Sequence, residues 1–325
     1  MKIKDLYNYA LEQMDESLLK ADSRKNIGIL LDNLQKYEIT TNEMWFEYHF
    51  NDNVDLIFKV WDMKKLYKFY EENVYKKSRE TKDLTDGLYY VLKKIVEDDF
   101  EEKKYIKAIS LEYDNLELNK KDPCPCLFFE IDYENLPKGK TLKIYKNIID
   151  FLVLHTVKFS TAEINGLMKK IIYLGKEGFH LWNIGFMVPR NKFLRLVWGP
   201  CTFEKCCLLS QNMGYEICSN NRYSNYLDNN AEYILDCDFT GDFFTNLGTN
   251  IYHKSYEKRV DMLKKISHYE NISMSTIYAL LKWPQKKIYC NKDKKGLLIW
   301  QICHMKLRAD GSPLKVYIRL EDFGL

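Results

Sequence analysis

Residues 304–322, HMKLRADGSPLKVYIRLED, have the pattern of a β-hairpin with two unlike faces. Gly311, Ser312 and Pro313 between the arms are typical turn residues. Because successive side chains of a strand point to opposite faces, the second arm has one apolar and one cationic face. Its cationic face either meets water or lines a polar cavity that receives an anion. The alternating residues are Leu314, Val316, Ile318 and Leu320 on one face, and Lys315, Tyr317 and Arg319 on the other.

The same alternation recurs along the chain, each time after segments whose apolar residues have helical spacing. Two helices precede each pair of strands, except before the fourth pair, where only one helix is clear. Helices are predicted at 5–19, 24–37, 63–77, 83–98, 141–156, 160–174, 202–213, 255–268 and 273–283. Strand pairs are predicted at 43–50 and 54–61, 105–113 and 126–133, 179–188 and 193–199, 231–239 and 247–253, and 298–308 and 314–320.

Five helix-helix-strand-strand units in 325 residues give an average period of 65 residues. A unit of this size cannot bury its own apolar faces, so neighbouring hairpins must pair. Ten antiparallel strands joined in this way can close into a barrel, which removes exposed sheet edges. The sequence therefore predicts an α+β fold: five ααββ repeats form a closed ten-stranded antiparallel β-barrel with helices outside. Residues 1–325 are predicted to form a single domain.

A barrel of this kind makes a prediction about each strand. The residues that face the helices must be apolar, while the opposite face points into a lumen that needs large side chains or a ligand to fill it. The predicted lumen residues are Trp45, Glu47, His49, Asp55, Ile57, Lys59, Trp61, Phe128, Glu130, Asp132, Arg195, Val197, Asp236, Asp238, Asn250, Tyr252, His304, Lys306, Lys315, Tyr317 and Arg319.

Composition limits the partners. Lysine and arginine number 49 and aspartate and glutamate 46, so the net charge of +3 offers no bulk attraction for nucleic acid or an anionic membrane. The longest apolar stretch is interrupted by Asp150 and His155 and is too short to span a bilayer, and the N-terminus lacks the features of a signal peptide. We therefore expect a cytoplasmic protein without membrane insertion. Its nine scattered cysteines are expected to be buried or inert thiols.

The fivefold ααββ order with a polar and aromatic lumen resembles the ABBA prenyltransferases, over the whole chain and in topology rather than in a short motif. In the indole-modifying branch of that group, the first hairpin provides a carboxylate that acts on the aromatic acceptor and a cation that meets the diphosphate. Glu47 and Lys59, twelve residues apart on the first hairpin, match that arrangement. The resemblance thus implies a transferase, with Glu47 as a catalytic candidate and His49 beside it as a possible acid-base partner.

Further roles follow from the same resemblance. Ionisation of an allylic diphosphate requires stabilisation of the departing charge, which Lys and Arg provide through charge-assisted hydrogen bonds, and aromatic faces stabilise the allylic cation. Tyr252 and Tyr317 are the candidates that shield the cation. The candidate diphosphate ligands are Lys59, Arg195, Lys306, Lys315 and Arg319.

The lumen is also unusually acidic, and this keeps other interpretations open. Asp236 and Asp238 are candidate ligands for Mg²⁺, and the lumen carboxylates are equally suited to a cationic substrate. The partners implied are an allylic diphosphate and a small-molecule or peptide acceptor, as in natural-product biosynthesis. One alternative is a different enzyme in which the lumen carboxylates, rather than the cations, carry out the chemistry. The other is a non-catalytic peptide-binding accessory protein. The run at 304–322 is similar to that of uncharacterised proteins encoded near bacterial peptide-modification genes.

Overall fold

The computed structural model describes most of the chain. The described residues are 2–12, 14–50, 53–77, 82–97, 99–120, 123–156, 159–189, 194–217, 224–241, 244–283, 285–291, 294–309, 312 and 314–324. The expected turn residues Gly311 and Pro313 lie outside them.

Helices alternate with strand pairs along the chain, as the apolar spacing predicts. Several helices begin at a side-chain cap, and Ser160 with Glu163 forms a capping box. The helices are α1 (Ile3–Leu11), α2 (Ala21–Lys36), α3 (Met63–Tyr70), α4 (Lys82–Val96), α5 (Asn115–Leu118), α6 (Thr141–Thr156), α7 (Thr161–Lys176), α8 (Phe203–Asn212), α10 (Tyr256–Tyr269) and α11 (Met274–Lys282).

The strands form one antiparallel sheet that closes on itself. The strands are β1 (Glu43–His49), β2 (Asn53–Val60), β3 (Ile106–Tyr113), β4 (Cys126–Ile131), β5 (Leu181–Phe186), β6 (Leu194–Cys201), β7 (Glu232–Phe239), β8 (Phe244–Tyr252), β9 (Gln285–Asn291), β10 (Lys294–Arg308) and β11 (Lys315–Gly324). Their order is β11-β1-β2-β3-β4-β5-β6-β7-β8-β10-β9, and β10 also pairs with β11. Ten strands therefore make a closed barrel, and β9 is attached to β10 outside it.

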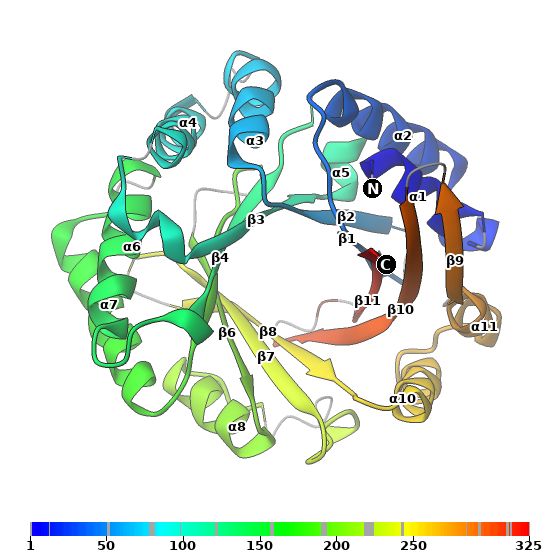
Figure 1. The fold of residues 1–325 in the computed structure, drawn as a ribbon. Helices are drawn as coiled ribbons and strands as arrows, with labels where there is room; N and C mark the ends of the chain where they lie inside the picture. Colours follow the sequence, from blue (N-terminus) through cyan, green and yellow to red (C-terminus); the bar gives the residue numbers. More distant parts are fainter. Residues whose placement is uncertain are drawn as a thin grey trace.

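The helices surround this barrel, as Figure 1 shows in a view down its axis. The strand residues that face the helices are apolar and buried, for example Met44, Phe46, Leu56 and Phe58, which are 0–1% exposed. The main hydrophobic core is therefore the layer between barrel and helices, and its burial provides most of the drive to fold. The predicted fold class is confirmed, while the single domain stays a prediction.

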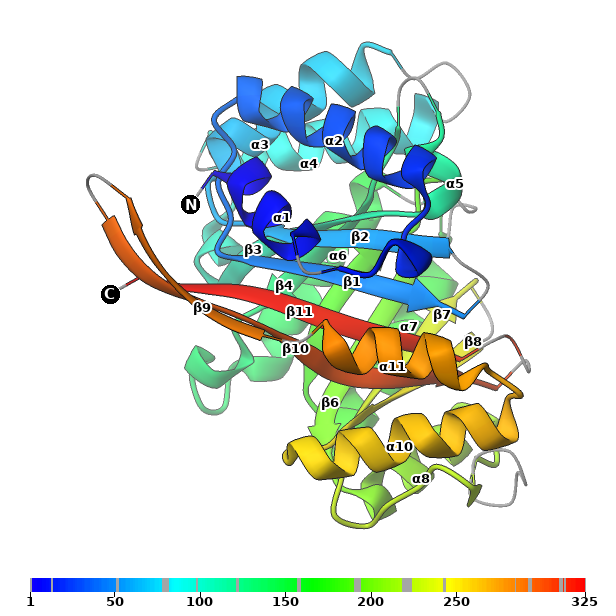
Figure 2. The ribbon, with the colours of Figure 1, turned by 90° about the vertical axis from the view of Figure 1, so that its right-hand side faces the viewer.

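Strand β9 is the main departure from the predicted element order. Residues 285–291, QKKIYCN, show no clear alternation because two adjacent lysines interrupt it. The strand nevertheless forms, because the first half of β10 provides a hydrogen-bonding edge for it. Figure 2 shows β9 and this half of β10 projecting beyond the barrel.

Gly87 lies where helix α4 packs most closely on α6, and a β-carbon there would meet the backbone oxygen of His155 at 1.9 Å. We expect Gly87→Ala to lower the free energy of unfolding by about 3 kcal/mol, because backbone atoms cannot move aside as a flexible side chain can. Urea unfolding followed by circular dichroism measures this loss.

Gly166→Ala in α7 is the matched control, since nothing lies within 4 Å of the added carbon. Alanine is the better helix former, so we expect this variant to gain up to about 1 kcal/mol. Equal effects of the two substitutions would contradict the close packing of α4 on α6.

Candidate active site

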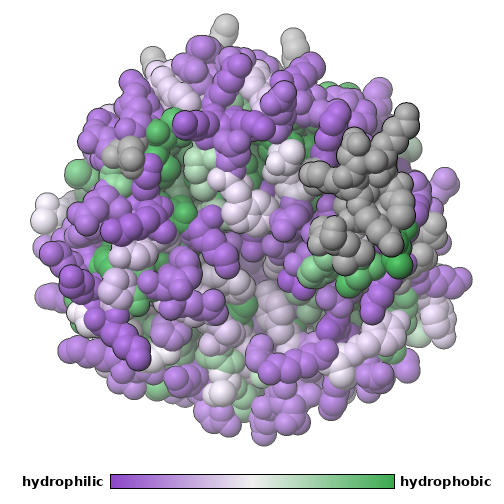
Figure 3. Space-filling model, viewed as in Figure 1, coloured by the Kyte–Doolittle hydropathy of each residue, from purple (hydrophilic) through white to green (hydrophobic). Residues whose placement is uncertain are grey.

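The barrel lumen contains a pocket of about 130 Å³, counted as the space that the centre of a water-sized sphere can occupy. Figure 3 looks down the barrel from the side of Figure 1 and shows the surface hollowed at its centre. The lining comes from all ten barrel strands and mixes aromatic with charged side chains. It comprises Trp45, Ile57, Lys59, Ser110, Glu112, Phe128, Glu130, Trp182, Asn183, Arg195, Val197, Ile234, Asp236, Asn250, Tyr252, His304, Lys306 and Tyr317.

The predicted site residues occupy two kinds of position. Lys59, Arg195, Lys306, Tyr252, Tyr317 and the metal candidate Asp236 line this pocket. Glu47, His49, Lys315, Arg319 and Asp238 are not part of its lining, although each pairs with another lumen side chain. The cationic face of β11 therefore does not lie in open water: Lys315 is 9% exposed and Tyr317 is 6% exposed.

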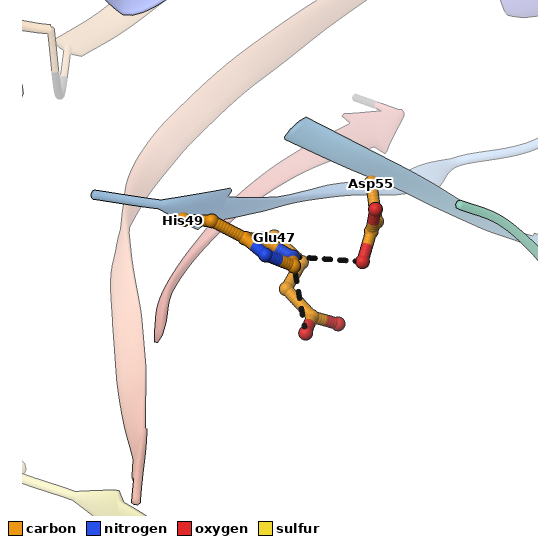
Figure 4. Close-up of side chains that lie close together, drawn as sticks. All are labelled: Glu47, His49 and Asp55. Atoms are coloured by element: carbon orange, nitrogen blue, oxygen red, sulfur yellow. Dashed lines mark hydrogen bonds and ion pairs between the residues drawn. The ribbon is translucent and has the colours of Figure 1, made fainter. Parts of the chain in front are cut away.

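The first charged cluster joins β1, β2 and β11 around Glu47. The Lys315 ammonium contacts the Glu47 carboxylate and lies 3.6 Å from Asp55 Oδ2. His49 Nε2 lies 2.8 Å from the same Asp55 oxygen and 3.7 Å from Glu47 Oε1, as Figure 4 shows. The other Asp55 oxygen accepts a hydrogen bond from the Asn115 backbone N–H at the start of α5. This cluster holds the Glu47 carboxylate in place.

The second charged cluster joins β6, β7 and β10. Arg195 donates two hydrogen bonds to Asp238, at 2.7 and 3.0 Å, and Lys306 Nζ lies 2.7 Å from Asp236 Oδ2. All four side chains are at most 6% exposed. Gly248 makes room for the lysine, because a β-carbon there would lie 2.6 Å from Lys306 Cε. Asp236 and Asp238 therefore already have cationic partners.

The third charged cluster lies toward the β9 end of the barrel. Lys59 Nζ lies 3.1 Å from Glu43 and 3.0 Å from Glu130. Arg319 approaches Glu43 at 3.9 Å and Glu321 at 3.2 Å. The Lys59 and Arg319 side chains are 18% and 30% exposed, so they are the predicted cations most open to solvent.

Between these clusters lies a stack of aromatic rings. The His304 imidazole lies between Tyr252 and Tyr317, with ring centroids 4.2 and 4.0 Å apart, and Trp45 meets His304 edge-on at 5.6 Å. Burial, with the nearby Lys306 charge, holds the pKa of His304 well below its ordinary value. The imidazole is therefore neutral at neutral pH, and the lining offers three aromatic faces and one uncharged imidazole.

Burial and the paired charges also shift the titration of the acids and bases. Burial lowers the pKa of Lys306 to about 8, against the opposing pull of Asp236. Burial alone would raise the pKa of Glu47, yet Lys315 and Lys306 hold it well below its usual range. Glu47 is thus ionised at neutral pH, whereas Lys306 is the lumen cation whose charge changes near physiological pH.

The charges of the pocket balance. Its lining contains three cations, Lys59, Arg195 and Lys306, and three carboxylates, Glu112, Glu130 and Asp236. Each of the five predicted diphosphate ligands has a carboxylate oxygen within 4.0 Å. An anion that enters must therefore displace carboxylates from these cations, because each of the five already has a carboxylate partner.

Sequence alternation missed part of the lining, and local irregularities of the strands explain most of the misses. Register shifts lie in β3 between Ile106 and Ala108, and between β5 and β6 beside Asn183. A bulge changes which face a residue occupies. Ser110 and Glu112 lie beyond the first shift, and Trp182 and Asn183 lie within the second. A third shift, between Ile302 and His304, explains why His304 does not share the phase of Trp300.

Two predicted lumen residues lie beyond the ends of their strands. Trp61 follows the end of β2 and is 41% exposed, and Asp132 lies past β4, where its carboxylate accepts a hydrogen bond from Asn135. The alternation of apolar and polar residues predicted longer strands than the backbone hydrogen bonds form.

The described residues bring possible metal ligands together elsewhere than predicted. Glu47, His49 and Asp55 form one such group, and Asp55, Glu112 and Asp114 form another. The Lys315 ammonium already lies between Glu47 and Asp55, where it neutralises the group that a cation would bind. Asp236 and Asp238 are likewise bound to Lys306 and Arg195. Glu47 and Asp55, like Asp236 and Asp238, are thus already neutralised by a cation, and Mg²⁺ dependence stays a prediction.

The described free cysteines are poor nucleophiles. They are Cys124, Cys126, Cys201, Cys206, Cys237 and Cys303. Burial raises the pKa of each thiol, for example to about 12 for Cys124 and about 11 for Cys303. Cys207 is disulfide-bonded, so it is not the free thiol that the sequence suggested.

Comparison with known proteins gives matches in structure alone. The chain matches no known protein family and no curated protein sequence. The 5-dimethylallyltryptophan synthase from Streptomyces coelicolor is 9% identical, with a TM-score of 0.56 over 98% of this chain and 97% of that one. The 6-dimethylallyltryptophan synthase from Micromonospora olivasterospora, solved in complex with DMASPP and tryptophan, is 10% identical, with a TM-score of 0.54 over 86% and 81%.

AnaPT from Neosartorya fischeri is also 10% identical, with a TM-score of 0.53 over 86% of this chain and 77% of that one. At this level of identity these likenesses show the fold, which is the ααββ barrel of the ABBA aromatic prenyltransferases. No helix within the described ranges is long and apolar enough to cross a membrane.

The Glu47–Lys315 pair gives a direct test of the lumen electrostatics. We expect Lys315→Met to lower the free energy of unfolding by roughly 3 kcal/mol, because Glu47, 2% exposed, is left without its ammonium partner. The double variant Glu47→Gln with Lys315→Met should recover most of this loss, since neither charge remains. Urea unfolding of the wild type, both single variants and the double variant measures the coupling.

The control is Lys146→Met on α6, which removes an exposed partner of Asp150. Exposed pairs contribute little, so a change below about 0.5 kcal/mol is expected. A similar loss of unfolding free energy in Lys315→Met and Lys146→Met would show that burial does not make Glu47 depend on Lys315.

Proposed function

We propose that the protein transfers an allylic prenyl group from its diphosphate to an aromatic or other nucleophilic acceptor inside the barrel. One observation supports this best: three cations, Lys59, Arg195 and Lys306, line the same pocket as the aromatic stack of Trp45, His304, Tyr252 and Tyr317. Departing diphosphate needs the first set and an allylic cation needs the second. The fold shared with dimethylallyltryptophan synthases is consistent with this chemistry.

The first step breaks the bond between the allylic carbon and the bridging oxygen, and the electron pair stays on the diphosphate. Lys306 and Arg195 are 6% exposed at their side chains, so their charge acts in a site with little water to screen it. To contact the diphosphate they must loosen their bonds to Asp236 and Asp238. Lys59, the more exposed cation, must likewise exchange its contacts with Glu43 and Glu130 for the diphosphate.

The aromatic rings then protect the allylic cation. The faces of Tyr252, Tyr317 and Trp45 stabilise positive charge through their quadrupoles and exclude water that would capture the cation. The neutral His304 between the tyrosines adds no charge that would oppose it. The acceptor's π electrons or lone pair then form the new bond to carbon, and the acceptor's proton passes to an oxygen of the departed diphosphate, the base that the first step supplies.

Glu47 is suited to orient the acceptor. Its carboxylate is ionised and fixed by Lys315. Because Glu47 lies outside the pocket lining, an acceptor must displace part of that lining before its N–H or O–H donates a hydrogen bond to Glu47. Because its pKa is held low, Glu47 is a weak base, and its role is orientation more than proton removal. His49 pairs with Asp55, and Asp55 in turn lies beside Lys315. His49 therefore positions other residues and does not contact the acceptor itself.

The acceptor is proposed to be a small aromatic molecule or a peptide side chain in bacterial natural-product biosynthesis, in the cytoplasm. A second candidate is a non-catalytic peptide-binding accessory protein. The pairing of each predicted lumen cation with a carboxylate favours it. If no anion ever enters the lumen, each buried cation needs a permanent carboxylate partner.

Titration calorimetry with dimethylallyl and geranyl thiolodiphosphates, with and without Mg²⁺, separates the two candidates. Transfer requires micromolar binding that falls about tenfold or more in Lys306→Met, which removes one charge-assisted contact. Lys205→Met is the control, because Lys205 lies on α8 outside the pocket lining. Absence of binding under both conditions would sink the transferase proposal and favour the accessory protein.

The Lys306 pKa of about 8 predicts how this binding depends on pH. The protonated ammonium that attracts the diphosphate is lost as pH rises through 8, so affinity should fall about tenfold between pH 7 and pH 9. Lys306→Arg keeps its charge throughout this range, and its affinity should stay nearly constant. Parallel pH profiles for the two proteins would contradict a role for Lys306 in holding the anion.

A further inference from the structure

The barrel wall is extended at one end by a three-stranded arm. It consists of β9, the first half of β10 and the end of β11, and it projects past the barrel mouth in Figure 2. In this arm Ile288 of β9 lies opposite Leu297 of β10, and Leu297 lies opposite Phe323 of β11. These three residues therefore lie side by side across the arm, and together they are here called the apolar row.

The outer face of the arm is already covered. Leu298 is fully buried. Lys287, its partner in the register, has its ammonium 2.7 Å from Oε2 of Glu12, the residue after α1, and 4.6 Å from the centre of the Tyr9 ring. Since neighbouring residues point to opposite faces, the apolar row lies on the other face. Ile288 is 66% exposed and Phe323 is 42% exposed, so this face has no cover among the described residues.

The apolar row is continuous with the lumen. Along β11 it shares one face with Tyr317, Arg319 and Glu321, and Tyr317 lines the pocket. Ile299 lies opposite Glu321 on the same face, between the row and the pocket. A molecule whose reactive group enters the lumen can therefore rest its remaining length on the arm.

Two further features describe what would rest there. Within the described residues, no strand pairs with the outer edge of β9, so its backbone groups are open to an added strand. Lys286 of β9 lies opposite Ile299 in the register, so it shares the face of the apolar row, and it is exposed. An extended chain with carboxylates complements both the open edge and the charge.

We propose that the arm docks an extended, acidic polypeptide whose acceptor side chain enters the lumen. This inference rests on the proposed function and deepens it: the acceptor is a residue of a peptide rather than a free small molecule. The peptide pairs with the β9 edge, places apolar side chains on the apolar row and meets Lys286 with a carboxylate.

The test uses fluorescence anisotropy of the full-length protein with a labelled peptide, acetyl-Glu-Thr-Glu-Val-Trp-Val-Glu-Thr-Glu-amide. We expect binding that weakens about tenfold in Ile288→Asp and in Phe323→Asp, because each substitution removes apolar contact area and repels the peptide. Ile29→Asp on α2 is the matched control, since Ile29 is 52% exposed on a helix away from the arm, and it should bind like the wild type.

Thiolodiphosphate titration of the same variants separates this proposal from the proposed function. Unchanged thiolodiphosphate binding in Ile288→Asp, with weaker peptide binding, supports the arm as the docking site. No peptide binding to the wild type, or equal binding by wild type and Ile288→Asp, would overturn it whatever the thiolodiphosphate result. A peptide with Lys in place of Glu should bind more weakly, and equal binding would rule out the acidic partner.

A second copy of the chain is the other possible occupant of the β9 edge. Sedimentation at two protein concentrations detects it. A dimer that dissociates in Ile288→Asp, without peptide binding by the wild type, would assign the edge to self-association and overturn the peptide proposal.

Discussion

The pairing of β1 with β11 is the contact on which the rest of the structure depends. Seven consecutive residue pairs, from Glu43–Glu321 to His49–Lys315, join the first barrel strand to the last. This closure places the polar face of every strand in a lumen instead of in water. Charged side chains there must then find partners of opposite sign, because a buried unpaired charge is very unfavourable.

The lumen meets that requirement with clusters that cross between strands distant in sequence. Glu47 depends on Lys315, Arg195 on Asp238 and Lys306 on Asp236. Such pairs add little to stability in comparison with apolar packing, yet each is strongly destabilising to break. Their value is positional, since they hold cations and carboxylates at defined places around the aromatic stack. They also make selection strict, because an anion must compete with carboxylates that are already bound.

The arm of β9 and β10 is the exception to closure. A barrel normally removes free sheet edges, and here one strand outside the ring restores an edge beside the mouth. The apolar row lies on the face continuous with the lumen, while the opposite face is fixed to α1 by Lys287. The exposed part of the wall is therefore held in place, at the position where a long acceptor would enter.

The repeat of two helices and two strands, and the alternation within each strand, determined the α+β barrel and most of the lumen residues from sequence alone. Trp45, Lys59, Arg195, Asn250 and Tyr317 follow from the period of two, because each strand has one face against the helices. Tertiary structure decided the rest. A bulge in β3 put the start of that strand out of phase with Ser110 and Glu112, and a bulge in β5 brought Trp182 to the pocket. Strand β9 forms only because β10 offers it an edge. The pairing of each predicted cation with a carboxylate also depends on register between strands far apart in the chain, which periodicity within one strand does not contain.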